Sequence, residues 1–258
     1  MALSPRGSRP SLPSVTIGGV GTVTVLDREM YSEAEAARLL EVPQQTLHYW
    51  LEGKKWRGYE YKPAIRIEPT GQRTLTWAEF VEAGLLSQYR KKNVPLEEVR
   101  RFISVLRDQT GSPYPLATAR PWAVGQKLVV EAQIESGLSR EYWLYAPVDN
   151  QLVMDLKGAK NTSGDFLPME LAPTRDFLER VEFADNEAIL WHPAGKSSPV
   201  VIDPDRRFGR PSVGGISTSV VNEYATSGYS YEEIAEEFNL TVRDVEMAVA
   251  YELSSKAA

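Results

Sequence analysis

The sequence contains no cysteine, which excludes disulfide bonds, thiolate metal sites, iron–sulfur clusters and a cysteine nucleophile. His48 and His192 are the only histidines and lie far apart, so a histidine-based metal site is not expected. No apolar stretch approaches the roughly 18 residues of a membrane-spanning helix. Gly-rich phosphate loops and a Ser-His-Asp order are also missing, so we expect a non-enzymatic protein without cofactor or metal. The absence of cysteine fits a reducing, cytoplasmic location.

Residues 1–20 are rich in proline and serine, and the early Arg6 and Arg9 are not followed by an apolar run. A signal peptide requires such a run, so this segment is expected to be a disordered arm. The folded part is expected to begin near residue 21.

The net charge of −6 is distributed unevenly along the chain. Residues 43–107 contain 12 Lys and Arg against 7 Asp and Glu, a surplus of five positive charges. Residues 199–258 contain 5 against 10, a surplus of five negative charges. This polarity suits a protein whose N-terminal part meets phosphates and whose C-terminal part meets another protein.

A helix–turn–helix pattern follows a short predicted strand at residues 21–27. Residues 32–35 read Ser-Glu-Ala-Glu, a capping box that predicts a short helix. Pro43 suits the first position of a second helix, and Gly53 predicts its end. The apolar residues of the second helix fall at i, i+3 and i+4 and predict its buried stripe: Leu47, Trp50 and Leu51.

The next segment predicts a β-hairpin, with strands at residues 61–69 and 73–77. Two amphipathic helices are predicted after it, at about residues 78–92 and 95–109. A hairpin in this place would be the wing of a winged helix-turn-helix.

Residues 31–107 resemble the DNA-binding domain of the MerR group of regulators. The matching pieces are Tyr31-Ser32, Ala36-Ala37-Arg38-Leu39-Leu40, Val42-Pro43, Thr46-Leu47-His48-Tyr49-Trp50 and Val94-Pro95-Leu96-Glu97-Glu98-Val99-Arg100-Arg101-Phe102. The resemblance implies that helix 43–52 enters the major groove of double-stranded DNA and that the wing touches the backbone. Two features depart from the group: His48 stands where an arginine is usual, and no long coiled-coil helix follows.

The candidate DNA contacts are polar residues of the second helix and cations of the loops behind it. They are Gln44, Gln45, Thr46, His48, Tyr49, Lys54, Lys55, Arg57, Lys62, Arg66 and Arg73. Glutamine can bond an adenine edge, and each phosphate contact adds to the salt dependence of binding. The alternative for these residues is an ordinary solvated surface.

Residues 111–198 predict a β-rich middle domain, with strands at 127–133, 142–146, 151–156, 181–184 and 188–192. Its aromatic residues favour a domain core, and lining a ligand pocket is the alternative: Trp122, Tyr142, Trp143, Tyr145 and Trp191. The second interpretation would make the protein a regulator that senses a small molecule.

The C-terminal segment predicts a strand near 200–203 and helices at 218–226, 231–238 and 241–253. With Phe208-Gly209-Arg210-Pro211 and Gly214-Gly215-Ile216-Ser217, it resembles a small family known as a domain of unknown function and often called a VapB-type antitoxin. That family usually has Gly-Thr-Arg where Gly215-Ile216-Ser217 stands here. The resemblance implies a toxin–antitoxin pair with a PIN-type ribonuclease as toxin.

The predicted class is α+β: an N-terminal winged helix-turn-helix (21–110), a β-rich middle domain (111–198) and a C-terminal three-helix module (199–258). The predicted function is that of a DNA-binding antitoxin and transcriptional autorepressor. We expect a homodimer, because helix-turn-helix proteins usually bind two half-sites and the last helices carry more apolar residues than 60 residues are expected to bury alone. An adaptor that never binds DNA is the alternative, and self-occlusion of helix 43–52 would favour it.

Two groups of acidic residues in this segment have both a functional and a purely structural interpretation. Asp203 and Asp205 are expected to form a turn rather than a catalytic site. The acidic residues of the helix at 231–238 either face a partner or are a solvated face: Glu232, Glu233, Glu236 and Glu237.

Overall fold

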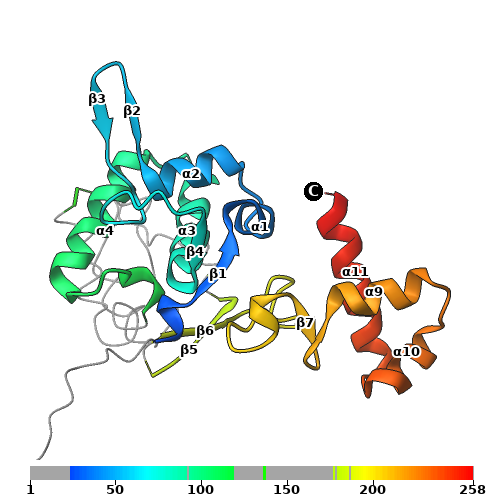
Figure 1. Cartoon of the computed structure of the whole chain (residues 1–258). Helices are drawn as coiled ribbons and strands as arrows, with labels where there is room; N and C mark the ends of the chain where they lie inside the picture. Colours follow the sequence, from blue (N-terminus) through cyan, green and yellow to red (C-terminus); the bar gives the residue numbers. More distant parts are fainter. Residues whose placement is uncertain are drawn as a thin grey trace, which may run out of the picture.

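The computed structural model describes residues 24–91, 93–118, 136–137, 177, 179–185 and 187–257 (Figure 1). The described part combines α-helices with short antiparallel two-stranded sheets, which is the α+β mixture predicted. The predicted arm at 1–20 and the predicted strands at 127–133, 142–146 and 151–156 lie outside the described residues.

The predicted helix pair is present at the N-terminal end. Helix α1 spans Glu33–Leu39 and helix α2 spans Gln44–Glu52. The capping box is confirmed, because Ser32 Oγ accepts from the Glu35 N–H while the Glu35 carboxylate accepts from the Ser32 N–H at 3.1 Å. These bonds satisfy backbone donors that the first turn of a helix leaves free.

Helix α2 is anchored by its predicted apolar stripe. Leu47, Trp50 and Leu51 are at most 2% exposed. Pro43 is the residue before the helix rather than its first residue. Gly53 ends the helix with φ 69°, a conformation that costs glycine little. The opposite side of α2 is left for solvent or a ligand.

The strand predicted at residues 21–27 was wrong where the structure describes it. Val25–Asp27 forms a 3-10 turn, η1, because the Asp27 and Arg28 N–H groups donate to backbone carbonyls three residues earlier. The strand lies just after it: β1 spans Glu29–Ser32 and pairs antiparallel with β4, Thr74–Thr76.

A β-hairpin follows α2 directly and projects from the body (Figure 1). Strand β2, Lys54–Trp56, pairs with β3, Tyr59–Tyr61. Arg57 and Gly58 connect them with φ of 51° and 82°. Two successive positive φ angles give the tight turn whose twist matches that of the strands.

The hairpin predicted at residues 61–77 was therefore wrong in position. Ala64 and Ile65 both donate their backbone N–H to the Trp50 carbonyl, so this segment is pinned to α2 and cannot form a strand ladder. Apart from Tyr61, which ends β3, only β4 is a strand in this segment, and its partner is β1 rather than the residues before it.

The two amphipathic helices lie within one residue of their predicted bounds. They are α3, Trp77–Lys91, and α4, Leu96–Thr110, and a 3-10 turn, η2, follows at Pro115–Ala117. The apolar residues that make these helices amphipathic are fully buried: Phe80, Val81, Leu85, Leu86, Tyr89, Val99, Phe102, Ile103 and Leu106. These faces form the centre of the larger core.

The last two predicted strands of the middle segment form a hairpin on that same core. Strand β5, Val181–Ala184, pairs with β6, Glu187–Trp191. The Trp191 ring lies 5.6 Å from that of Phe80 and 5.3 Å from that of Phe177, so Trp191 is a core residue. The other aromatic residues discussed for this segment lie outside the described residues: Trp122, Tyr142, Trp143 and Tyr145.

The chain remains attached to the N-terminal body beyond residue 199. Ile202 exchanges backbone hydrogen bonds with Trp191 and is buried in the larger core. The Tyr31 hydroxyl donates to the Gly209 carbonyl at 2.6 Å. Burial, with smaller contributions from the charges of Tyr251 and Glu35, raises the pKa of Tyr31, so its hydroxyl stays protonated as this donor role requires.

The C-terminal helices form a second unit with its own core. Strands β7, Ser212–Val213, and β8, Ile216–Ser217, lead into α9, Thr218–Thr226. Helices α10, Tyr231–Phe238, and α11, Val242–Ala257, follow, which confirms the three predicted helices. Their core residues are Val213, Val221, Ile234, Ala235, Val245, Ala248 and Val249.

The apolar set expected to need a partner is largely buried within this one module. Val221, Ile234, Val245 and Ala248 are fully buried, whereas Val220 is 36% exposed. The excess of apolar surface therefore gives little reason for dimerisation. Within the described residues, no helix has the length and apolar character needed to cross a bilayer.

Candidate nucleic-acid interface

The outward side of α2 is open, as DNA contact would require. Gln44 and Gln45 are exposed, and Thr46, His48 and Tyr49 are half-buried. The self-occlusion that would favour a non-DNA-binding adaptor is not seen in the described part of the chain.

An open groove of about 730 Å³ lies between α2 and the β2–β3 hairpin. Residues of both elements line it: Gln45, Thr46, His48, Tyr49, Gly53, Lys54, Trp56 and Tyr61. The groove thus brings most of the predicted helix contacts together with the base of the hairpin. A helix with one open face, flanked by a basic hairpin, can seat one strand of a duplex backbone against the hairpin while the helix reaches a groove.

The hairpin presents an aromatic and basic face that the sequence reading missed. The pairs Lys54–Tyr61 and Trp56–Tyr59 share one face, because side chains alternate along a strand. Trp56, Tyr59 and Tyr61 are 51%, 70% and 40% exposed. Arg57 lies over the Trp56 ring at 4.5 Å from its centroid, which holds its charge at the tip of the hairpin. The alternation of Lys, Trp and Tyr around Arg57-Gly58 was the signal that could have placed this hairpin.

Two other predicted cations of this region are exposed. Lys55 lies on the other face of the hairpin and forms a surface ion pair with Glu60 at 3.1 Å. Lys62 is exposed just beyond β3. Surface pairs of this kind contribute little to stability, so Lys55 can exchange its partner for a phosphate at small cost.

A buried carboxylate holds His48 and Arg73 together. Glu33, at the start of α1, is 1% exposed at its side chain and accepts from Arg73 at 2.8 Å. His48 Nδ1 lies 2.8 Å from the same carboxylate. Arg73 remains 70% exposed, so it can still reach a phosphate while Glu33 fixes its direction.

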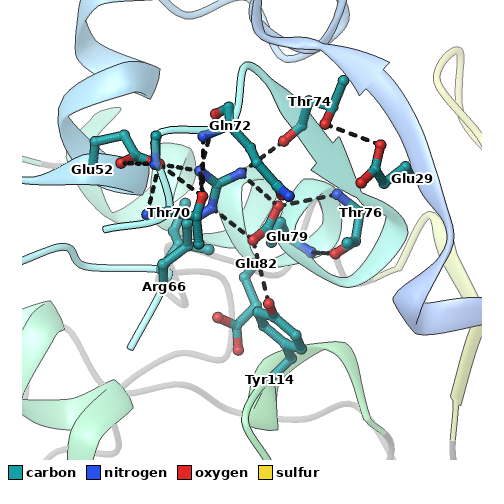
Figure 2. Close-up of polar contacts among 12 residues, drawn as sticks. Glu29, Glu52, Arg66, Thr70, Gln72, Thr74, Thr76, Glu79, Glu82 and Tyr114 are labelled. Atoms are coloured by element: carbon teal, nitrogen blue, oxygen red, sulfur yellow. Dashed lines mark hydrogen bonds and ion pairs between the residues drawn. The ribbon is translucent and has the colours of Figure 1, made fainter. Parts of the chain in front are cut away.

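Arg66 is a correction to the predicted set, because it is buried rather than free to meet DNA. Its side chain is 3% exposed and forms ion pairs with Glu52 and Glu79 (Figure 2). It also donates to Thr70 Oγ1 and to the Thr74 carbonyl, each at 2.7 Å. Burial alone would lower the pKa of Arg66, but the two carboxylates outweigh it and raise the pKa.

The Arg66 cluster ties the end of α2 to the loop before β4. Glu52, the last residue of α2, accepts from the Gly71 N–H at 2.8 Å and from Arg66. Burial would raise the pKa of Glu52, but these hydrogen bonds hold it below the usual value. The cluster therefore fixes α2 and the origin of the hairpin without touching a ligand.

A second buried acid lies behind this cluster. Glu82 on α3 is completely buried, accepts from the Leu116 N–H at 3.1 Å and lies 3.5 Å from Arg107. Burial is the largest influence and raises the pKa of Glu82 to about 7 despite Arg107. Glu82 lines neither of the two pockets described here, so we assign it to stability rather than to ligand binding.

Another cavity, of about 490 Å³, lies where α1, α3 and α11 approach one another. Charged and polar side chains dominate its lining, among them Arg38, Glu41, Lys91, Arg180 and Ser254. It differs in this from the apolar pocket expected of an effector-binding domain. Among the described residues, no cluster of three or more His, Asp or Glu side chains is arranged to hold a metal ion.

Comparisons with known proteins find a matching family, relatives in sequence and a similar solved structure. Residues 200–251 match the family described as "Protein of unknown function (DUF433)", which supports the C-terminal resemblance. "Uncharacterized protein Rv2308" of Mycobacterium tuberculosis is 27% identical over 238 residues, covering 90% of this chain and 93% of that protein. "Putative antitoxin VapB45" of the same organism is 26% identical over 239 residues, covering 87% and 95%. The crystal structure of Rv2018 from M. tuberculosis aligns with a TM-score of 0.62 at 25% identity, covering 88% of this chain and 100% of that one. The chain is therefore similar to an antitoxin-named protein over nearly its whole length, and to the DUF433 family over its C-terminal module.

Proposed function

We propose that this protein is a DNA-binding antitoxin that represses its own operon, with α1, α2 and the β2–β3 hairpin acting as a winged helix-turn-helix. The observation that carries the proposal is the groove between α2 and the hairpin, which gathers polar helix residues, the aromatic rings of Trp56 and Tyr61, and the cation Lys54 on one open face. The local surplus of positive charge over residues 43–107 supports it.

In this proposal α2 lies in the major groove. Gln44 and Gln45 at its exposed N-terminal end read base edges, because a glutamine amide can pair with adenine through two hydrogen bonds. Lys54, Arg57 and Lys62 neutralise backbone phosphates on the hairpin side. Arg73 adds a further contact, directed by Glu33.

The C-terminal module supplies the second half of the function. Its net charge of −5 argues against a second DNA reader, because such a surface repels phosphate. An acidic surface instead suits a nuclease toxin, since it can cover the basic surface that receives RNA. The antitoxin-named relative supports a toxin as partner, and the sequence resemblance implies that this toxin is a PIN-type ribonuclease.

The first test measures affinity for a fragment of the protein's own promoter over a series of salt concentrations. We expect a steep fall with salt, and Lys54→Gln should reduce the slope by about one phosphate contact. Arg101→Gln is the matched control, because Arg101 is an exposed cation on α4, away from the groove. A flat salt response, or equal effects of the two variants, would refute DNA binding through this face.

The second test separates toxin binding by the C-terminal module from DNA binding by the N-terminal body. Because Ile202 and Gly209 are bound to the N-terminal body, a truncation must fall after Pro211 rather than at residue 198. Co-expression with the toxin encoded beside the gene should restore growth for the full chain but not for residues 1–211. Promoter binding by residues 1–211 should persist. Neutralisation by the truncated protein would reverse the proposed division of labour.

A further inference from the structure

The turn at residues 206–210, between the two cores, holds an exposed aromatic side chain. Phe208 is 87% exposed, the largest exposed fraction among the described large apolar residues. Its neighbours on both sides are fixed. Gly209 gives its carbonyl to the Tyr31 hydroxyl at 2.6 Å, and Arg207 Nε donates to the Gly215 carbonyl at 2.8 Å.

The backbone of this turn is strained. Arg207 and Phe208 have φ of 52° and 54°, in the left-handed region that costs ordinary residues energy. Gly209 follows at 66°, and a Cβ there would overlap Met30 and the Tyr31 hydroxyl. A chain that only needed to turn here could use glycine or asparagine at all three positions. Strain held in place by surrounding bonds, and used to expose a phenyl ring, is typical of a binding loop.

The charges beside Phe208 limit what it can meet. The Arg206 side chain is 70% exposed, and its nearest acid is Asp203 at 3.4 Å within the same turn. Arg207 is exposed as well. A basic surface, such as the RNA-receiving face of a nuclease, would be repelled by these two arginines. The ring therefore fits a partner surface that is acidic with an exposed aromatic or apolar residue.

Helix α10 of this chain offers such a surface. Glu232, Glu236 and Glu237 are exposed and form no ion pair within the part of the chain that the structure describes. Tyr229, two residues before the helix, is 52% exposed. Two modules of charge −5 repel on average, so association is favoured only when the arginine-flanked loop of one copy faces α10 of the other. A two-fold axis would form this contact twice.

We propose that the Phe208 turn is a docking loop for a second copy of this chain, with Phe208 packed against Tyr229 and α10, and Arg206 facing Glu236. This assignment deepens the proposed function by naming the surface that pairs two DNA-reading units. In this assignment the toxin binds the other acidic residues of the C-terminal module. Its test uses no DNA, so failure here and failure of DNA binding are separate results.

The experiment is sedimentation velocity of the full chain over a micromolar dilution series. We expect a reversible dimer, and Phe208→Gly should weaken it by about tenfold or more. Thermal unfolding at a dilution where both proteins are monomeric should show the variant melting at a higher temperature, because glycine relieves the strain. Ile67→Ser is the control, since Ile67 is an exposed apolar residue elsewhere, at 60%.

Charge reversal tests the partner surface. Arg206→Glu and Glu236→Arg should each weaken the dimer, and the double variant should restore it, because both contacts then pair opposite charges again. A wild-type monomer throughout the series would overturn the proposal. Equal dimerisation of Phe208→Gly and wild type, or failure of the double variant to recover when both single variants are weakened, would overturn it as well.

Discussion

Glu82→Gln is the most informative single change in the core, because Glu82 is a fully buried carboxyl whose pKa is about 7. In the unfolded chain its pKa returns to the ordinary value of 4.5. Between these values the folded state holds a proton that the unfolded state has lost. Stability from this group is therefore fully present below pH 4.5 and is lost as the pH rises through 7.

The size of the effect follows from the shift. About 2.5 pKa units at about 1.4 kcal/mol each give roughly 3 kcal/mol lost by pH 8. Glutamine cannot ionise, and its carbonyl can still accept from the Leu116 N–H. Arg107 keeps its bonds to the Ile65 and Pro113 carbonyls, so it is not left without a partner. We expect Glu82→Gln to match wild type near pH 4.5 and to exceed it by up to about 3 kcal/mol at pH 8.

Urea unfolding of both proteins at several pH values between 4.5 and 8 measures this difference. Other groups titrate in the same range, but they are common to both proteins and cancel in the comparison. Parallel stability curves would show that Glu82 titrates normally in the folded state, and a variant less stable than wild type at pH 8 would show that its charge is needed.

Three other substitutions test the packing and the candidate interface. Gly84→Ala would stabilise an ordinary helix by about 1 kcal/mol, but here the new methyl overlaps the Phe177 ring, so we expect a lower melting temperature, and a rise would contradict this contact. Arg66→Met removes the cation that lies between Glu52 and Glu79, so it should lower the free energy of unfolding by about 3–5 kcal/mol in chemical denaturation. A loss of less than about 1 kcal/mol would show that the two carboxylates find other partners. Gly53→Ala combines φ of 69° with a methyl that overlaps the Tyr61 carbonyl, so it should displace the hairpin and weaken promoter binding, and unchanged affinity would separate the hairpin from DNA contact.

Local patterns in the sequence predicted the helices well, because each helix carries its own signals. The Ser32 capping box, the stripe of α2 and the apolar faces of α3 and α4 are all encoded within a few residues of where they act. The hairpin was misplaced because its position depends on a contact distant in sequence. The backbone N–H groups of Ala64 and Ile65 donate to the Trp50 carbonyl, so they are not free for a strand ladder. A segment with strand-forming residues therefore becomes a loop.

The candidate site was predicted in part for a similar reason. Exposure of Gln44 and Gln45 follows from helical periodicity alone. Burial of Arg66 does not, because it depends on two carboxylates from α2 and α3 that only the tertiary fold brings together. The aromatic face of the hairpin was missed with the hairpin itself, since Trp56 and Tyr59 share a face only when they pair across the turn.

The contacts of residues 204–209 with the N-terminal body connect the two cores. They would decide how a protein bound to the C-terminal module could affect DNA bound to the N-terminal body. Arg28 donates to the Pro204 carbonyl at 2.7 Å and pairs with Asp205, and the Tyr31 hydroxyl donates to the Gly209 carbonyl. Arg28 directly precedes β1 and Tyr31 lies within it, and β1 is the strand that leads into α1. The C-terminal module is thus attached at the base of the helix pair that would read DNA, rather than through a free linker. If the proposed function holds, a toxin or a second copy bound to that module would be connected to α1 through these contacts, and α1 carries Glu33, which contacts His48 and Arg73. The proposed function therefore predicts that coupling between partner binding and operator affinity runs through these few hydrogen bonds and ion pairs, which mutation can break one at a time.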